Sequence, residues 1–204
     1  ISNSDKMRPF FMSIVSDSNH WMFISSNGGL TAGRKNAESS LFPYYTDDKI
    51  TEMSEITGSK TILHVSVNNK SHIWEPFSIR QMGLYKTQTN LYKNIHGNKI
   101  VFEEKNLDLD LTYRYEWNSS NKFGFVKKST LINNSDDIIE ISFLDGLQNI
   151  IPSDVTTDLQ NSRSNLVDAY KKSELQEEVG LGIYALSAII VDKAEPSEAL
   201  KANI

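Results

Sequence analysis

The sequence of 204 residues contains no cysteine, which excludes disulfides, thiolate nucleophiles and zinc–thiolate sites together. This absence leaves the cellular compartment open. Positive charge is also scarce, because 21 lysines and arginines face 26 aspartates and glutamates, for a net charge of -5. A surface that binds phosphate backbones would have to form against that balance, so we expect no nucleic-acid partner.

Long apolar runs and leader segments are missing as well. No run approaches the roughly 18 apolar residues of a membrane-spanning helix, so no membrane partner is expected. The chain begins at Ile1 without a signal pattern and stops at Ile204 after an acidic, alanine-rich run, so we interpret it as the N-terminal piece of a longer chain. With 39% hydrophobic and 23% charged residues, the composition fits one globular domain over residues 1–204.

The common catalytic and metal-binding motifs are absent from the sequence. There is no nucleophile elbow, zinc-protease helix motif or phosphate-binding loop. The four histidines lie too far apart in the sequence to form a local metal-binding pair. Asp108 and Asp110 resemble the first residues of a calcium loop whose other ligands are lacking. We therefore expect neither a metal nor a cofactor.

Short runs of β-branched and aromatic residues, separated by Gly and Asn, predict an all-β protein. Asn27-Gly28 is a strong turn signal, and residues 107–117 alternate apolar and polar side chains, which predicts one face of leucines and tyrosines. Turn signals recur roughly every 8–12 residues, as in sandwiches. A short helix is predicted over residues 155–163. Residues 165–176 lack a clean helical stripe and are interpreted as a strand. The three tryptophans are expected in the core or at a domain interface.

The most unusual segment is residues 25–50, which is rich in glycine and lacks periodicity. Glycines allow close approach of the backbone to a ligand. Planar or charged side chains can donate and accept hydrogen bonds with the hydroxyls of a sugar ring. Flat aromatic side chains can pack against its C–H face. The candidate sugar-binding residues are Arg34, Asn36, Tyr44, Tyr45, Asp47 and Asp48, with Trp21 as a further flat face. The alternative is a long structural loop whose arginine pairs with an aspartate.

Several short motifs, read in order along the chain, resemble one enzyme family. They are Ser26-Asn27-Gly28-Gly29, Gly33-Arg34-Lys35-Asn36, Leu41-Phe42-Pro43-Tyr44-Tyr45-Thr46-Asp47-Asp48, Trp74-Glu75-Pro76-Phe77 and Glu195-Pro196-Ser197-Glu198. Each motif is weak alone, but their order is similar to the N-terminal region of the cellobiose and chitobiose phosphorylases, and of large bacterial relatives of these enzymes.

The resemblance implies a galactose-mutarotase-like β-supersandwich of two large antiparallel sheets, with at most short helices. In that family the general acid lies on a separate (α/α)₆ barrel, so this chain would not be catalytic by itself. Arg34, Asn36, Asp47 and Asp48 match the loop that reaches the sugar site. The family's tryptophan-rich segment is replaced here by residues 42–45, which leaves the sugar undefined. The implied partners are a carbohydrate and the catalytic domain of the same parent chain.

Three functions remain open after the sequence analysis. An accessory domain of a glycoside phosphorylase or glycoside hydrolase-like enzyme predicts an exposed apolar patch where a catalytic domain packs. An autonomous carbohydrate-binding module predicts coplanar aromatic residues and sugar binding without a partner. A mutarotase-like enzyme requires a histidine and a carboxylate that face one pocket, and the sequence offers no obvious pair. We rank the accessory domain first and the mutarotase last.

Overall fold

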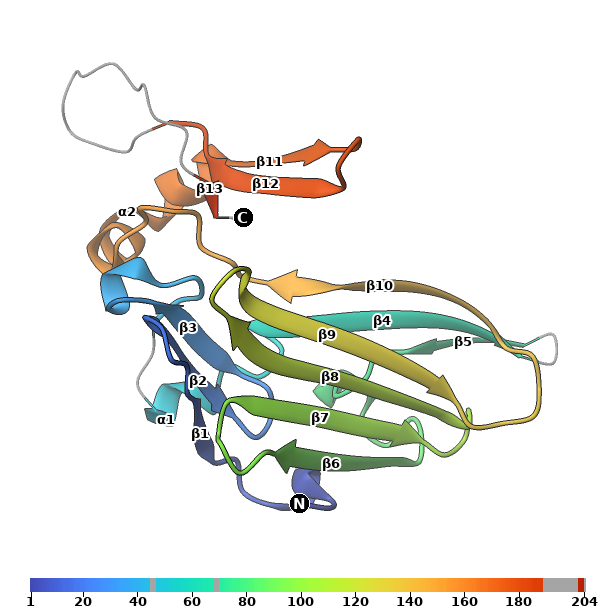
Figure 1. Cartoon of the computed structure of the whole chain (residues 1–204). Helices are drawn as coiled ribbons and strands as arrows, with labels where there is room; N and C mark the ends of the chain where they lie inside the picture. Colours follow the sequence, from blue (N-terminus) through green and yellow to red (C-terminus); the bar gives the residue numbers. More distant parts are fainter. Residues whose placement is uncertain (45–46, 68–69, 189–201, 204) are drawn as a thin grey trace.

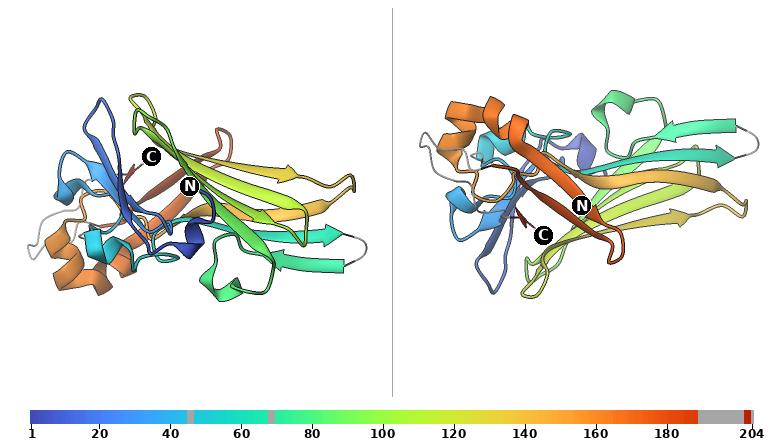
Figure 2. Two further views of the ribbon diagram at one scale, coloured as in Figure 1. Left: turned by 90° about the horizontal axis from the view of Figure 1, so that it is seen from below. Right: turned by 90° about the horizontal axis from the view of Figure 1, so that it is seen from above.

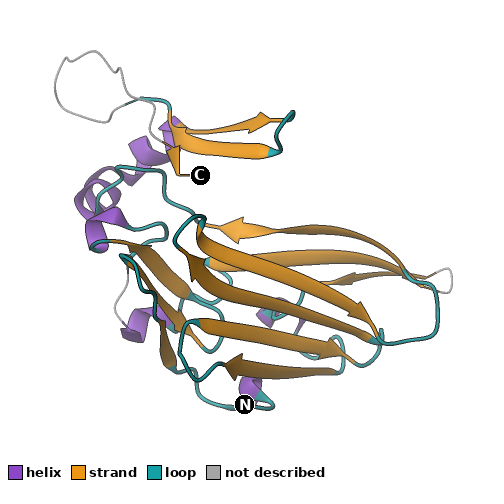
Figure 3. Ribbon diagram, in the orientation of Figure 1, coloured by secondary structure: helices purple, strands orange, loops and turns teal. Residues whose placement is uncertain are grey.

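The computed structural model describes residues 1–44, 47–67, 70–188 and 202–203. Within these residues the protein is an all-β sandwich, as the sequence predicts, and its strands form four antiparallel sheets (Figures 1 and 3). No helix of the described residues is long and apolar enough to cross a membrane.

Two sheets pack face to face and enclose the main core. The first has the order β6-β7-β8-β9 and the second the order β10-β4-β5. Their bounds are β4 Gly58–Val67, β5 Lys70–Trp74, β6 Thr87–Lys93, β7 Lys99–Asn106, β8 Leu111–Ser120, β9 Gly124–Asn133 and β10 Glu140–Gln148. The edge strands β9 and β10 lie on the same side of the sandwich (Figure 1).

The inner faces of these sheets follow the expected alternation of side chains. In β8, Leu111, Tyr113, Tyr115 and Trp117 are all buried in the main core. The strand begins four residues later than predicted, however, so Leu107 is exposed. Asn106 causes this shift, because its Oδ1 accepts hydrogen bonds from the backbone N–H groups of the next turn.

A third sheet closes one end of the sandwich. It contains β1 Phe11–Ile14, β2 His20–Ser25 and β3 Leu30–Arg34, in that order. The turn between β2 and β3 is the Asn-Gly turn predicted from the sequence, and Gly28 adopts a φ of 92° there. The short helices beside this sheet and along the chain are η1 Ser4–Lys6, η2 Ala37–Ser39, α1 Asp47–Ile50 and η3 Ile79–Gln81.

The C-terminal part of the described chain lies apart from the sandwich. Helix α2 Thr157–Tyr170 leads into β11 Lys171–Gln176 and β12 Leu181–Leu186, and β13 Ala202–Asn203 pairs with β12. Viewed from above, the β11–β12 hairpin runs diagonally across β9 and β10 (Figure 2). The predicted strand over residues 165–176 is therefore wrong for its first half, which is helical.

The local reason for this helix is a cap at its start. Thr156 Oγ1 accepts a hydrogen bond of 3.2 Å from Leu159 N, which begins α2 where a short helix was expected. Val167 is the one described residue of α2 that is fully buried, which explains why the sequence shows no apolar stripe. It belongs to a small second core with Ile151 and Val155.

Candidate functional site

A groove of about 1010 Å³ lies between the sandwich and the β11–β12 hairpin. Its sandwich side is lined by residues of β2, β3, β8, β9 and β10, of the η2 segment and of the segment after β10. Residues that contribute charged, polar or aromatic groups to the lining include His20, Arg34, Phe123, Lys127, Glu174 and Tyr184. The volume is at the upper end of the range of small-molecule sites, roughly 300–1,000 Å³.

Arg34 is the one described residue of the predicted sugar-binding set that lines this groove. It ends β3 with an exposed side chain, and its Nε donates a hydrogen bond of 3.1 Å to Asn19 Oδ1. The contact orients the guanidinium while leaving its other donors available, because the hydrogen bond uses a single N–H. No ion pair links Arg34 to a carboxylate among the side chains that the structure describes. The side chains of Asp47 and Asp48, the two aspartates of the loop, lie outside that part, so an Arg–Asp pair within the loop stays an open alternative.

The other predicted residues lie elsewhere. Asn36 is exposed in the turn that precedes η2, and Tyr44 packs edge-on against Trp21 with ring centroids 5.9 Å apart. Neither lines the groove. The backbone of Asp47 and that of Asp48 form the start of α1, whereas Tyr45 lies outside the described residues. The structure therefore does not gather the predicted set into one pocket within its described part.

His20 stands beside Arg34 in the groove. Its Nδ1 lies 2.6 Å from Ser18 Oγ, and its ring packs edge-on against Phe125 at a centroid distance of 5.1 Å. Burial lowers the pKa of His20, and the positive charge of Arg34 lowers it further. The imidazole is therefore neutral at physiological pH and can donate or accept a hydrogen bond.

An exposed aromatic ring forms the rim of the groove. Phe123 has 71% of its surface exposed at the turn between β8 and β9, and Lys122 Nζ lies 5.2 Å from the centre of its ring. Gly124 has a φ of 73°, a conformation that this tight turn requires and that glycine adopts without strain. A large apolar side chain held in solvent by a turn is available for contact with a ligand.

A polar cluster joins the two main sheets beside the groove. Asp145 on β10 accepts hydrogen bonds from Lys127 Nζ at 2.6 Å and from Ser129 Oγ at 2.8 Å, both on β9. Thr61 and Tyr113 also contact its carboxylate, from β4 and β8. Burial opposes ionisation of Asp145, but hydrogen bonds from Lys127, Thr61 and Ser129 outweigh it and hold the pKa below its ordinary value. Mainly through burial, the pKa of Tyr113 is raised to about 12, so this phenol is no general base at neutral pH.

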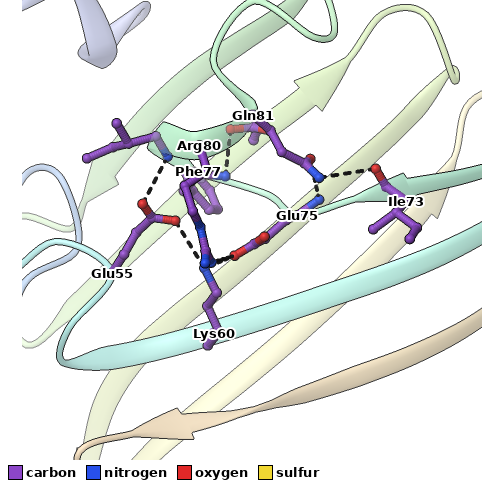
Figure 4. Close-up of polar contacts among 9 residues, drawn as sticks. Glu55, Lys60, Ile73, Glu75, Phe77, Arg80 and Gln81 are labelled. Atoms are coloured by element: carbon purple, nitrogen blue, oxygen red, sulfur yellow. Dashed lines mark hydrogen bonds and ion pairs between the residues drawn. The ribbon is translucent and has the colours of Figure 1, made fainter.

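A second polar cluster contains Glu55, Lys60, Glu75 and Arg80 (Figure 4). Lys60 pairs with both glutamates, and Arg80 donates to Glu75 at 2.7 Å. The adjacent cavity measures about 20 Å³, which is enough for about one water molecule and too small for a sugar. This cluster is a structural contact between the start of β4 and the segment around η3.

Two of the motifs that carried the family resemblance meet at this small cavity. Asn27 and Gly28 of the first motif line it together with Pro76 and Phe77 of the Trp74–Phe77 motif. The latter motif is anchored by Glu104, which accepts hydrogen bonds from Trp74 Nε1 at 2.9 Å and from Phe77 N at 2.8 Å. These residues therefore hold the sandwich together. The last motif, residues 195–198, lies outside the described residues.

Sequence reasoning missed most of the groove. Phe123, Lys127 and His20 belong to none of the motifs and to no candidate set selected from the sequence. The hairpin residues Glu174 and Tyr184 carried no motif at all. The Lys-Phe-Gly turn at residues 122–124 was the one local signal, because it places a large ring where a tight turn exposes it.

The described residues contain neither a metal-binding cluster nor a histidine hydrogen-bonded to a carboxylate. No group of three or more His, Asp or Glu side chains is arranged for a metal ion in this part of the chain. His20 and His64 instead contact the hydroxyls of Ser18 and Ser71. The acid–base pair of a mutarotase is therefore not formed by these contacts.

Comparison with known proteins gives no independent identification. No family model matches the sequence, and a search of curated proteins found no match. Any assignment of function therefore depends on the groove, on the apolar surfaces and on the motif resemblance.

Proposed function

We propose that the chain is an accessory carbohydrate-binding domain of a glycoside phosphorylase or glycoside hydrolase-like enzyme, and that an oligosaccharide binds in the groove. The observation that carries the proposal is the combination of aromatic faces and polar groups in one large groove. A sugar ring presents hydroxyls at its edge and C–H groups on its faces, so it requires both kinds of partner.

The groove supplies these partners from both walls. Phe123 and Tyr184 offer aromatic faces, and the guanidinium of Arg34 offers planar donors. Glu38 and Glu174 offer carboxylate acceptors. Charges of both signs line the groove, which favours a neutral, polyhydroxylated ligand over a nucleic acid or a strongly charged one.

An apolar outer face favours the accessory domain over an autonomous module. Ile62, Ile73 and Leu144 lie on the outward face of the β10-β4-β5 sheet, and all three are exposed. The direct pairing of Leu144 with Ile62 makes this apolar surface continuous across two strands. Such a face is typical of a surface that packs against another domain.

Calorimetric titration with gluco-, galacto- and manno-configured disaccharides and tetrasaccharides, with and without phosphate, tests the proposal. We expect at least one saccharide to bind. We expect Phe123→Ala to weaken binding about 3–10-fold by removing an aromatic face, and Arg34→Ala to weaken it by removing planar donors while the fold stays intact.

Phe143→Ala is the matched control, because Phe143 is also a highly exposed phenylalanine but does not line the groove. Equal loss of affinity in the Phe123 and Phe143 variants would argue against the groove. If this chain bound no saccharide, binding in the groove would be overturned, and binding by a longer parent alone would then indicate a different site, shared with the catalytic domain.

A further inference from the structure

The groove has two walls that belong to differently anchored parts of the fold. One wall is formed by the sandwich, with His20, Arg34 and Phe123. The other is formed by the β11–β12 hairpin, with Glu174 and Tyr184. A ligand that contacts both walls would link these two parts of the described chain.

The connecting segment is tied to the sandwich at its beginning. Ile151 N donates a hydrogen bond of 2.8 Å to Leu41 O, and Thr157 N, at the start of α2, donates one of 3.1 Å to the carboxylate of Glu38. These contacts fix the loop after β10 and the first turn of α2 against the segment after β3. The first half of α2 therefore moves with the sandwich.

The hairpin makes its polar contacts locally. Ser187 N donates to Tyr170 O at 2.8 Å, Lys171 pairs with Asp168 at 2.7 Å, and Lys172 pairs with Glu174. Among the described residues, no hydrogen bond or ion pair connects β11 or β12 to the two main sheets. Nothing polar therefore holds the two walls at a fixed separation in this part of the structure.

Helix α2 contains a break between these two regions. Arg163 has a φ of -143° and a ψ of 36°, which interrupts the helical backbone after its tied first half. Beyond the break, Val167 and Leu186 hold the hairpin through the small second core. A backbone break beside a small core is a place where the hairpin can rotate with little loss of buried apolar surface.

We propose that the β11–β12 hairpin is a movable wall that closes over an oligosaccharide in the groove. This inference depends on the proposed function. It adds that the hairpin changes position when an oligosaccharide binds in the groove. Closure would bring Glu174 and Tyr184 onto a ligand already in contact with Arg34 and Phe123, and would exclude water from their hydrogen bonds. The ligand shifts the population because its contacts with the hairpin wall form only in the closed state.

The absence of cysteine allows a direct test by spin labelling and pulsed electron resonance. The double variant Leu175→Cys/Thr130→Cys places one label on β11 and one on β9, and neither residue lines the groove. The control pair Thr87→Cys/Thr130→Cys lies on two strands of one sheet. The probes are maltotetraose, cellotetraose and mannotetraose, together with any saccharide that the titration identifies.

We expect the β11–β9 distance distribution to be broader than that of the control pair without saccharide, and to narrow when a saccharide binds. A β11–β9 distribution as narrow as the control without saccharide would overturn the movable wall, whatever binds. A broad distribution that a bound saccharide leaves unchanged would overturn closure while the proposed function stands. Failure of every saccharide to bind in the titration would overturn the proposed function, and closure over a sugar with it.

Discussion

Asp145 shows how one carboxylate can hold two sheets together at an open side of the sandwich. Asp145 lies on β10, and its carboxylate oxygens accept hydrogen bonds from side chains of β4, β8 and β9. Lys127 is its charged partner, and the lysine side chain is only 9% exposed. An ion pair with a largely covered lysine is harder to replace by water than a pair in solvent.

The pKa of Asp145 makes this contribution dependent on pH. A carboxyl group whose pKa is lowered on folding stabilises the fold fully above its ordinary pKa of 3.8, and this stabilisation is lost as the pH falls through the lowered value. We expect Asp145→Asn to lower the free energy of unfolding by about 1–3 kcal/mol at neutral pH. The difference from wild type should shrink as acid protonates Asp145. Urea denaturation at a series of pH values measures both effects.

Asp168→Asn is the control for that experiment. Its pair with Lys171 is a surface contact, with the aspartate side chain 70% exposed, so the expected change is about 0–1 kcal/mol. If the Asp145 variant were no less stable than this control at neutral pH, the polar cluster would not stabilise the contact between the sheets.

At the scale of single residues, one of the predicted sugar-binding residues, Arg34, lines the groove, and its role in sugar binding stays a prediction. Arg34 was selected because a planar donor follows a glycine-rich turn, and it does line the groove. Tyr44 met the same criterion of residue type but packs against Trp21 and does not line the groove. Residue type and proximity in sequence could not reveal the opposite wall, which is formed some 140 residues later.

At the scale of elements, Gly33 in β3 occupies a position with no room for a side chain. A Cβ there would lie 2.6 Å from Ser39 O, 2.6 Å from the ring of Trp21 and 2.7 Å from Ser40 Cα. Gly33 also forms an isolated antiparallel bridge with Ser40, so the segment after η2 runs directly beside this strand.

We expect Gly33→Ala to destabilise the protein by about 1–3 kcal/mol or more, because two of the three clashes are with backbone atoms that cannot rotate away. Gly146→Ala on β10 is the matched control, since a Cβ there would meet no atom within 4 Å. Thermal unfolding followed by circular dichroism compares the two variants. Equal melting temperatures would show that the η2 segment moves aside at little cost.

Turn chemistry and side-chain alternation predicted the strands of the sandwich well, because both are local. The Asn-Gly turn and the buried residues of β8 follow from neighbouring residues alone. Residues 165–176 were interpreted wrongly over their helical half, because α2 buries only Val167 and its apolar pattern is therefore weak. The packing that stabilises this helix comes from Ile151 and Val155, which precede it in the chain.

At the scale of the whole molecule, the described part of the chain contains two separate apolar cores. The main core is formed by the two large sheets together with the β1-β2-β3 sheet. The second core contains Ile151, Val155 and Val167, with Leu159 and Leu186 packed against it. Composition indicates that a core exists but not that it is divided, because the division depends on contacts between elements. A core this small stabilises its own region weakly, so local opening should precede global unfolding.

This division predicts the effect of Val167→Ala. Removing a buried side chain from the second core should cost roughly 1–3 kcal/mol locally. Amide hydrogen exchange in β11 and β12 should therefore accelerate by one to two orders of magnitude, while exchange in β7 and β8 and the global denaturation midpoint stay unchanged. Leu63→Ala, in the main core, should instead lower the midpoint and accelerate exchange throughout. If Val167→Ala lowered the midpoint in the same way, the hairpin and the sandwich would unfold as one cooperative unit, and the second core could not act as an independent support for the groove wall.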